Sequence, residues 1–416
     1  MNLSLALPLL ITICGAVLLV RLRFFFIFHP IRTARLILPT LRDRKTRSSF
    51  LLALAGTLGV GNIFGVCAGL MIGGAGSVLW LLVSSVFSMV IKYAECTSVF
   101  SSPVQGGIHR TILTTFSRLG KPLSLMYAAL CASLSLFMGS AIQSGAVADI
   151  ASSSYGIPPL ICAFILSFFL LIAVIGGVSK IEKITEKLVP LTTVIYILLA
   201  FLVIIANVSR LPSAICRIFT DAFSVRSVGG GTVAFLNTKA LYEGFARGIL
   251  SNEAGSGTSS LAHSRSSGRS AAAAGVSGIF EVFFDTTVLC VLTALAVLCA
   301  VPDISAYQTP MSLICAAICS VSELFSLPLL ISIFIFAYST VICWFYYGEE
   351  CICYLFGDRF RRPFTLIFVV FIFVGASVSS RALISLTDVI IFAMSLITLA
   401  TVMKNINAVS DTLRDI

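Results

Sequence analysis

The sequence predicts an all-α integral membrane protein of about eleven transmembrane helices, and two observations carry this prediction. Hydrophobic residues make up 58% of the 416-residue chain and charged residues only 11%, whereas a soluble domain carries about 25% charged residues. The apolar residues also gather in runs of about 20, the length that crosses a bilayer as a helix. We place these spans near residues 3–22, 50–72, 77–99, 122–148, 158–177, 188–208, 232–260, 272–300, 326–347, 364–379 and 382–403.

The first and seventh spans differ from the others. The first is followed by arginines and lacks both a preceding basic stretch and a small-residue cleavage site, so we expect a retained helix rather than a signal peptide. The seventh is interrupted by polar and charged residues, namely Asn237, Lys239, Glu243, Arg247 and Glu253. We expect a peripheral helix and basic cytoplasmic loop over 1–48, two halves over 49–209 and 210–403, and a cytoplasmic tail over 404–416.

The net charge of +10 is distributed among loops and does not form a nucleic-acid-binding surface. Basic residues are dense between the first two spans, from Arg21 to Arg47, and they recur in alternate loops after that. Cytoplasmic loops are enriched in Lys and Arg. We therefore expect a multi-pass plasma-membrane protein, of the bacterial inner-membrane kind, with its N-terminus outside, its C-terminus in the cytoplasm and lipid around it.

The segment from Gly56 to Asn62 interrupts the second span with three glycines, a threonine and an asparagine. A helix can unwind at such glycines, and unwound backbone at membrane depth is tolerated only where it lines a cavity or is buried in protein. One half-helix then offers carbonyls to a cation, and the next offers N–H groups to a carboxylate. This break can hold both ends of a zwitterion. The alternative is helix packing through Gly61, Gly65 and Gly69, with Asn62 bonding to another helix.

A second break of the same kind falls at Asn252–Gly257 in the seventh span. Glu253 is either functional at this depth or, as the alternative, part of an ion pair with Arg247. We expect Asn252 and Gly255 to help bind the substrate, because broken helices hold the substrate in secondary transporters. The two breaks lie five spans apart, as expected of two inverted five-helix repeats whose first helices face each other at the membrane midplane.

The ninth span places the hydroxyls of Ser339 and Thr340 next to each other, with the backbone carbonyl of Phe336 one turn earlier. These oxygens, completed by carbonyls of the first break such as that of Gly56, are suited to a hard cation such as Na⁺. The alternative is that both hydroxyls bond to carbonyls of their own helix. In the fourth span, Gln143 is either a hydrogen-bonding residue between helices or a pocket amide.

Several ordered motifs resemble those of the alanine or glycine:cation symporters, the sodium/alanine symporter family, from about Ser49 to about Gly357. The matching motifs are Gly56–Ile63, Gly73–Gly76, Lys92–Glu95, Gln143–Ser144, Glu186–Pro190, Ala246–Gly255 with Ala262–His263, Asp285–Thr286, and Ser339–Thr340 with Trp344 and Tyr346–Glu349.

The resemblance implies a LeuT-type core of five plus five helices after a peripheral first helix. It also implies Na⁺-coupled import of small neutral amino acids, chiefly alanine and glycine, with no cofactor other than the coupling ion. By motif match, the substrate pocket would be lined by Thr57, Gly59, Gly61, Asn62, Gln143 and Trp344, and Na⁺ would be held by Ser339 and Thr340.

Two other functions stay open from the sequence. One is proton-coupled transport of another small zwitterion, with Glu253 or Asp149 changing its protonation state, and the other is an amino-acid sensor that binds without transporting. An enzyme is not expected, because the chain has no HExxH motif, no nucleophile elbow and no paired membrane aspartates. The 13 cysteines lie mostly within apolar spans and the three histidines are far apart, so we expect no structural metal site.

Overall fold

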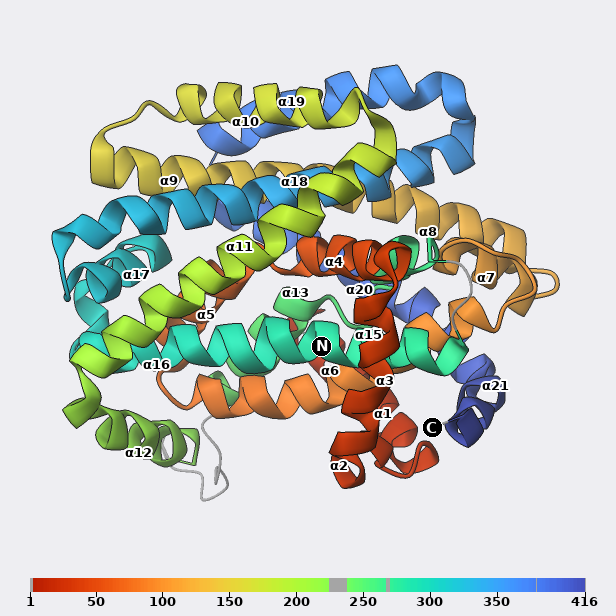
Figure 1. Ribbon diagram of the computed structural model, residues 1–416, viewed down its shortest axis with the longest axis horizontal. Coiled ribbons are helices and arrows are strands. Elements are labelled where there is room, and N and C mark those ends of the chain that lie inside the picture. The colour runs from red at the N-terminus through yellow and green to blue at the C-terminus, as the bar shows by residue number, and fades with distance from the viewer. Residues whose placement is uncertain (1–2, 224–237, 267–269, 379, 416) are drawn as a thin grey trace.

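Helices account for nearly all of the chain in the computed structural model, which describes residues 3–223, 238–266, 270–378 and 380–415 (Figure 1). No strand occurs in these ranges, so the predicted all-α fold class is confirmed. Residues 232–237, at the start of the predicted seventh span, lie outside them.

Eight helical elements of the described chain are long and apolar enough to cross a membrane. They are α4–α5 (Arg44–Thr57, Gly61–Gly73), α6 (Ser77–Phe100), α8–η1–α9 (Gly120–Leu134, Ser135–Ile142, Gln143–Tyr155), α11 (Gly177–Ala206), α15–η3–α16 (Ala271–Val282, Phe283–Cys290, Val291–Ala300), α18 (Ser326–Phe356), α19 (Arg361–Ser377) and α20 (Ser380–Lys404). The other predicted spans are the shorter α1 (Leu3–Arg21) and α10 (Pro159–Val174) and the interrupted pair α13 (Thr238–Asn252) and α14 (Ser259–His263). Over the described residues, each predicted span therefore coincides with one helical element or, for the seventh, with the two helices on either side of a break.

Short helices connect or flank the spans: α2 (Phe25–Phe28), α3 (Pro30–Arg42), α7 (Ile108–Thr115), α12 (Leu211–Ala222), α17 (Pro310–Cys319) and α21 (Ile406–Asp411). The basic stretch predicted as a loop before residue 48 is thus largely helical. In α3, Thr33 and Ile37 are buried while Arg32 and Arg35 are exposed. This separation of apolar and basic faces is typical of a helix that lies along a surface.

Both predicted breaks are present. α4 ends at Thr57 before α5 begins at Gly61, and α13 ends at Asn252 before α14 begins at Ser259. In the second break Glu253, Gly255 and Gly257 have φ values of +55°, +91° and +75°. Residues other than glycine rarely adopt such values, and a continuous helix excludes them.

The fourth and eighth spans each contain a π-helical segment, Ser135–Ile142 (η1) and Phe283–Cys290 (η3). Such segments interrupt the regular α-helical register and occur frequently at functional sites. The first ends directly before Gln143, and the second contains Asp285. The spacing of apolar residues gave no indication of either segment.

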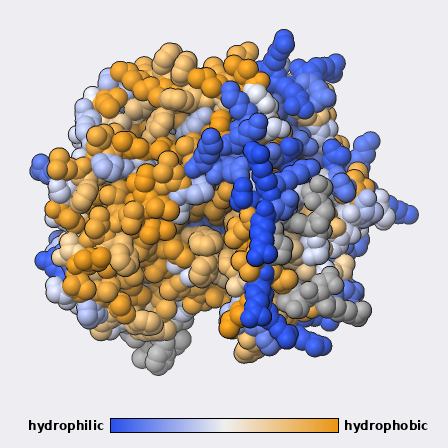
Figure 2. All heavy atoms as spheres, viewed as in Figure 1, coloured by the Kyte–Doolittle hydropathy of each residue, from blue (hydrophilic) through white to orange (hydrophobic). Residues whose placement is uncertain are grey.

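The core is formed by helices that are distant in sequence. α6 packs along α13 and α15, and α4 packs against α11, α14 and α18. Figure 2 shows apolar side chains over the part of the surface where α10 and α11 lie, and exposed residues there include Phe164 and Phe201. Hydrophilic side chains gather instead on the side of α3 and α7. The proposed division into two inverted repeats, 49–209 and 210–403, stays a prediction.

Candidate substrate and ion site

The first break is joined to α18 by Thr340. Its hydroxyl Oγ1 donates to the Ala55 carbonyl at 3.0 Å and lies 3.4 Å from the Leu58 carbonyl. These carbonyls stand at the end of α4, where a helix leaves carbonyl groups without intrahelical partners. Thr340 is only 1% exposed, so the three oxygens meet in a buried place between two spans.

Ser339, the preceding residue of α18, donates to the Phe336 carbonyl at 2.9 Å. This is the hydrogen bond within the helix that the sequence left open as the alternative. With the oxygens around Thr340, this stretch of α18 and the end of α4 offer two hydroxyls and three backbone carbonyls, a donor set that fits a hard cation.

The Gly56 carbonyl, predicted for this oxygen set, has another partner. It accepts a hydrogen bond from the indole Nε1 of Trp344 at 3.3 Å. The carbonyls beside Thr340 are instead those of Ala55, in the last turn of α4, and Leu58, directly after it. Trp344 is fully buried and lies against η1, where a Cβ on Gly139 would collide with its side chain.

Gln143 contacts the first break directly. Its Oε1 accepts from the Val60 backbone N–H at 3.2 Å. A Cβ on Gly59 would lie 2.7 Å from Thr340 Oγ1 and 3.2 Å from Gln143 Oε1. Only glycine allows so close an approach, so three spans converge at Gly59.

The glycines of α5, Gly61, Gly65 and Gly69, do not all have the same surroundings. A Cβ on Gly69 or Gly65 would lie 3.3 or 3.9 Å from the Arg247 side chain, whereas one on Gly61 would meet no atom within 4 Å. The packing alternative therefore describes Gly65 and Gly69, which face α13, while Gly61 borders open space. Arg247 itself pairs with Glu243 at 3.0 Å.

Asn62, in the first turn of α5, reaches Asp285 in η3. Its Nδ2 lies 2.5 Å from Asp285 Oδ1 and 3.1 Å from the Asp285 carbonyl. The hydroxyls of Ser251 and Thr286 each donate to Oδ2 at 2.7 Å. Because Ser251 belongs to the last turn of α13, this carboxylate joins residues beside both breaks. Asn62 thus makes the interhelical bond that the sequence left open.

The predicted residues of the second break lie elsewhere. Asn252 donates to Thr286 Oγ1 and accepts from the Ala254 N–H, each at 3.0 Å. A Cβ on Gly255 would lie 2.6 Å from Ile11 of α1 and 3.3 Å from Ser395 of α20. Asn252 therefore contacts η3 and the second break itself, and Gly255 lies against α1 and α20.

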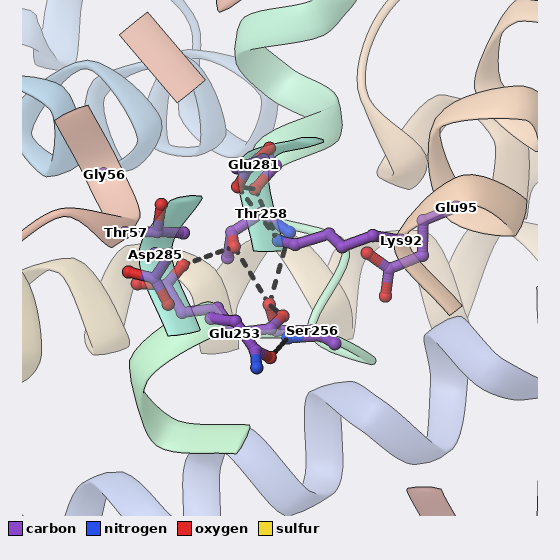
Figure 3. Close-up of polar contacts among 12 residues, drawn as sticks. Gly56, Thr57, Lys92, Glu95, Glu253, Ser256, Thr258, Glu281 and Asp285 are labelled. Atoms are coloured by element: carbon purple, nitrogen blue, oxygen red, sulfur yellow. Dashed lines mark hydrogen bonds and ion pairs between the residues drawn. The ribbon is translucent and has the colours of Figure 1, made fainter. Parts of the chain in front are cut away.

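Buried charged residues surround the second break (Figure 3). The Lys92 ammonium of α6 donates to Ser259 Oγ at 2.5 Å and lies 3.4 Å from Glu281 Oε1. His263 Nε2 lies 3.1 Å from the other oxygen of Glu281. All four side chains are buried, so this cluster joins α6 and α15 to the short half-helix α14.

Two further carboxylates border the same break. Glu95 Oε1 accepts from the Gly257 N–H at 3.3 Å, and Glu253 Oε2 accepts from the Thr258 hydroxyl at 2.7 Å. The second oxygen of each carboxylate is buried without a hydrogen-bond partner among the described residues. The alternative ion pair between Glu253 and Arg247 is absent from the described structure, because Arg247 pairs within α13.

A cavity of about 960 Å³ opens between α4, α11 and α18. Basic residues line it, among them Arg47 and Lys183, and so does Tyr338, the neighbour of Ser339. The Arg47 and Glu186 side chains pair at 2.8 Å and join α4 to α11 there. An opening lined by cationic side chains thus borders the α18 residue that precedes the two hydroxyls.

Sequence reasoning missed Glu281 altogether and treated Lys92, Glu95 and Asp285 only as parts of family motifs. A charged residue in an apolar span is itself a signal of function. If every charged residue within a predicted span had been treated as a candidate functional residue, all four would have been identified. Their pairing depends on contacts between distant spans and could not be read from spacing.

Two broken spans, joined by buried polar groups within an all-helical membrane fold, define a secondary transporter. A family model described as the sodium:alanine symporter family matches residues 2–415. The chain belongs to this family, and the predicted resemblance is confirmed.

Curated relatives and solved structures agree with this assignment. The chain is 32% identical over 357 residues to the sodium/alanine symporter AgcS of Methanococcus maripaludis, which covers 83% of this chain and 78% of that protein. It is 28% identical over 331 residues to the sodium/proton-dependent alanine carrier protein of Bacillus sp. strain PS3, covering 74% and 73%. The crystal structure of MhsT in complex with L-phenylalanine is similar in fold, with a TM-score of 0.63 and 14% identity over 85% of this chain and 87% of that chain.

Proposed function

We propose that this protein imports a small neutral amino acid, such as alanine or glycine, together with Na⁺ by alternating access. The observation that carries the proposal is the meeting of the unwound first break with α18 at Thr340 and Ala55. Relatives named as sodium/alanine symporter and sodium/proton-dependent alanine carrier support the same substrate and ion.

In this proposal Na⁺ is bound by the Ser339 and Thr340 hydroxyls and by the carbonyls of Ala55, Leu58 and Phe336. Na⁺ is a hard cation that prefers oxygen ligands. The hydroxyl protons now donated to carbonyls would turn away, so that the hydroxyl oxygens could face the ion. Because the carbonyls of Ala55 and Leu58 come from the first broken span, and both hydroxyls and the Phe336 carbonyl come from α18, a bound ion would hold these spans together.

The amino acid would bind beside the break, at the open space that Gly61 borders. The start of α5 directs backbone N–H groups and a positive dipole end toward a carboxylate. The one arginine of the neighbouring helix, Arg247, is already paired with Glu243. We therefore propose that backbone N–H groups, rather than an arginine, receive the substrate carboxylate, with Gln143 and Trp344 around the rest.

The same proposal places the protein in the plasma membrane of a bacterial cell, with the N-terminus outside and the C-terminus in the cytoplasm. The alternation of basic loops supports this orientation. The cavity between α4, α11 and α18 would then open toward the cytoplasm, because basic residues line it.

A second candidate is proton coupling through Glu253. Its Oε1, which is buried without a hydrogen-bond partner among the described residues, favours this candidate, as does the relative named sodium/proton-dependent. Asp149, the other residue considered for this role, is exposed in the middle of α9. A sensor that binds without transporting would keep the pocket and show no uptake.

Binding of radiolabelled alanine to the purified protein, in NaCl and in choline chloride, tests the proposal. We expect alanine to bind in NaCl, and glycine and serine to compete while leucine and phenylalanine do not. Binding that is equal in both salts would contradict Na⁺ coupling, and leucine competing as well as alanine would contradict the small pocket.

A further inference from the structure

We infer that the cavity between α4, α11 and α18 binds the headgroup of an anionic phospholipid, whose acyl chains lie along the outward face of α11. The inference goes beyond the proposed function, because it holds for any transported substrate or ion. Two features of the structure point to it. Basic side chains of the cavity have no acidic partner among the described residues, and an exposed apolar track begins beside them.

Three basic side chains of the cavity supply the positive charge. Arg44 is the first residue of α4, and Lys183 and Lys187 stand one turn apart near the start of α11. All three are exposed and line the cavity, and none takes part in an ion pair among the described residues. Like charges four residues apart on a helix repel each other, so an anion between the two lysines would relieve this repulsion.

The acidic side chains next to the cavity are already engaged. Glu186 pairs with Arg47 at 2.8 Å, and Glu182, one turn earlier, pairs with Arg265 at 2.5 Å. Asp43 caps α4 by accepting a hydrogen bond from a backbone N–H. The cavity therefore keeps an excess of positive charge, and basic pockets between membrane helices bind anionic lipid headgroups.

Much of the remaining cavity wall is apolar. It is lined by Leu51, Ile184, Leu188, Pro190 and Tyr338. The Tyr338 hydroxyl donates to a backbone carbonyl of α10 at 3.1 Å, so this residue offers the cavity its ring. Burial of such a wall is favourable only against an apolar ligand, and a soluble anion such as phosphate would leave it exposed. An amphipathic anion fits both parts of the cavity.

An exposed apolar track on α11 starts at the cavity. Leu191, Val194 and Leu198 follow Lys183 and Lys187 on the same face of the helix, and each of the three is more than half exposed. The distance along the helix from Lys187 to Leu198 is about 16 Å, roughly half of the hydrocarbon thickness of a bilayer. Figure 2 shows the apolar surface of α10 and α11 beside the hydrophilic surface on the side of α3 and α7. Basic groups followed by one leaflet of apolar surface match the order of headgroup and acyl chains in a phospholipid.

The bound headgroup would connect two spans. Arg44 belongs to α4 and the two lysines belong to α11, and the pair of Arg47 and Glu186 already joins these helices at the same place. α4 also carries the Ala55 carbonyl that accepts from Thr340. An anionic lipid bound here would therefore hold the first half of the first broken span against α11.

Lipid binding to the purified, delipidated full chain tests this inference, measured by native mass spectrometry in neutral detergent without amino acid. The probes are phosphatidylglycerol, phosphatidylcholine with the same acyl chains, and glycerol 3-phosphate, which has the anionic group but no chains. The test variant combines Arg44→Gln, Lys183→Gln and Lys187→Gln.

A control variant removes the same charge elsewhere. Arg118, Lys121 and Arg362 are exposed basic residues outside the cavity lining, and their combined change to Gln should leave phosphatidylglycerol binding unchanged. The variant Lys183→Arg, Lys187→Arg keeps both charges and should also bind like the wild type. In phospholipid-free detergent all variants should unfold at the wild-type temperature, because the replaced side chains are exposed.

Phosphatidylglycerol should bind the wild type about a hundredfold more tightly than phosphatidylcholine, since three basic residues attract the anionic headgroup. The test variant should bind the two lipids equally, and glycerol 3-phosphate should bind the wild type far more weakly than phosphatidylglycerol. Equal binding of both lipids to the wild type, or unchanged phosphatidylglycerol binding to the folded test variant, would overturn the inference.

Glycerol 3-phosphate that binds as tightly as phosphatidylglycerol would also overturn it, because the cavity would then be a site for a soluble anion. None of these outcomes depends on the binding of alanine or Na⁺. Failure of the proposed function would therefore leave this test intact.

Discussion

The Thr340 hydroxyl in α18 lies 3.0 Å from the Ala55 carbonyl in α4, although the two residues are 285 positions apart. The hydrogen bond satisfies a carbonyl at the end of a half-helix, where intrahelical partners run out. It also places a hydroxyl oxygen among carbonyl oxygens in a buried place. Any ion bound there would fix α4 relative to α18, and this relation connects ion binding to the movement of the first broken span.

Thr340→Val should lower the apparent affinity for Na⁺ by about tenfold, because it keeps the shape of the side chain and removes one oxygen ligand. The measurement is the Na⁺ dependence of alanine binding. Thr365→Val is the control, since the Thr365 hydroxyl bonds to the Arg361 carbonyl within its own helix. An unchanged Na⁺ dependence for folded Thr340→Val protein would exclude this hydroxyl as a ligand.

Gly59→Ala and Gly61→Ala should have different consequences. A Cβ on Gly59 would lie 2.7 Å from Thr340 Oγ1, so Gly59→Ala should displace the break and abolish binding of alanine and glycine alike. A Cβ on Gly61 has open space around it, so Gly61→Ala should leave thermal stability unchanged. If that space holds the substrate, Gly61→Ala should weaken alanine binding more than glycine binding. Equal effects on the two ligands would show that Gly61 does not border the substrate side chain.

Trp344→Ala should both destabilise the protein and widen its substrate preference. Loss of a fully buried tryptophan costs about 3–5 kcal/mol of unfolding free energy, and the space left beside the first break should admit leucine. Competition by leucine and thermal unfolding are measured together. Trp80 is partly buried in α6. Trp80→Ala is the control and should leave the preference for alanine unchanged. A destabilised Trp344→Ala protein that still rejects leucine would limit Trp344 to packing.

Lys92→Met should destabilise the fold by about 3–5 kcal/mol, because it removes the ammonium group that pairs with the buried carboxylate of Glu281. The double variant Lys92→Met, Glu281→Gln should recover part of this loss, as both charges are then removed. Thermal unfolding of the purified proteins gives the comparison, with Lys183→Met at an exposed position of α11 as the control. A single variant as stable as the wild type would mean that the ion pair between α6 and α15 does not support the fold.

The sequence carried enough information to predict the spans and both breaks, because these depend on local properties. Apolar runs of spanning length predict helices, and clustered glycines predict unwinding. The carbonyls next to Thr340 were not predictable, since the choice between Gly56 and its neighbours depends on the path of the unwound backbone. The link between Asn62 and Asp285 was equally out of reach, because it joins residues 223 positions apart.

Two other features show the same limit. The π-helical segment that contains Asp285 does not change the spacing of apolar residues, so the sequence did not indicate it. The helix α3 lies where a loop was predicted, because its many basic residues outweighed the few apolar residues of its buried face. Asn252 and Gly255 were grouped with the substrate residues because both breaks share a glycine pattern. In the structure Gly255 faces Ile11 and Ser395, whereas Asn252 bonds to Thr286, which bonds to Asp285, and the substrate role of both stays a prediction.

The most direct test of the account is uptake of radiolabelled alanine into proteoliposomes that contain the purified protein. An inward Na⁺ gradient should drive accumulation above equilibrium, and replacing external Na⁺ with choline should abolish it, with or without an inward proton gradient. Accumulation that a proton gradient drives equally well in Na⁺-free buffer would contradict the account.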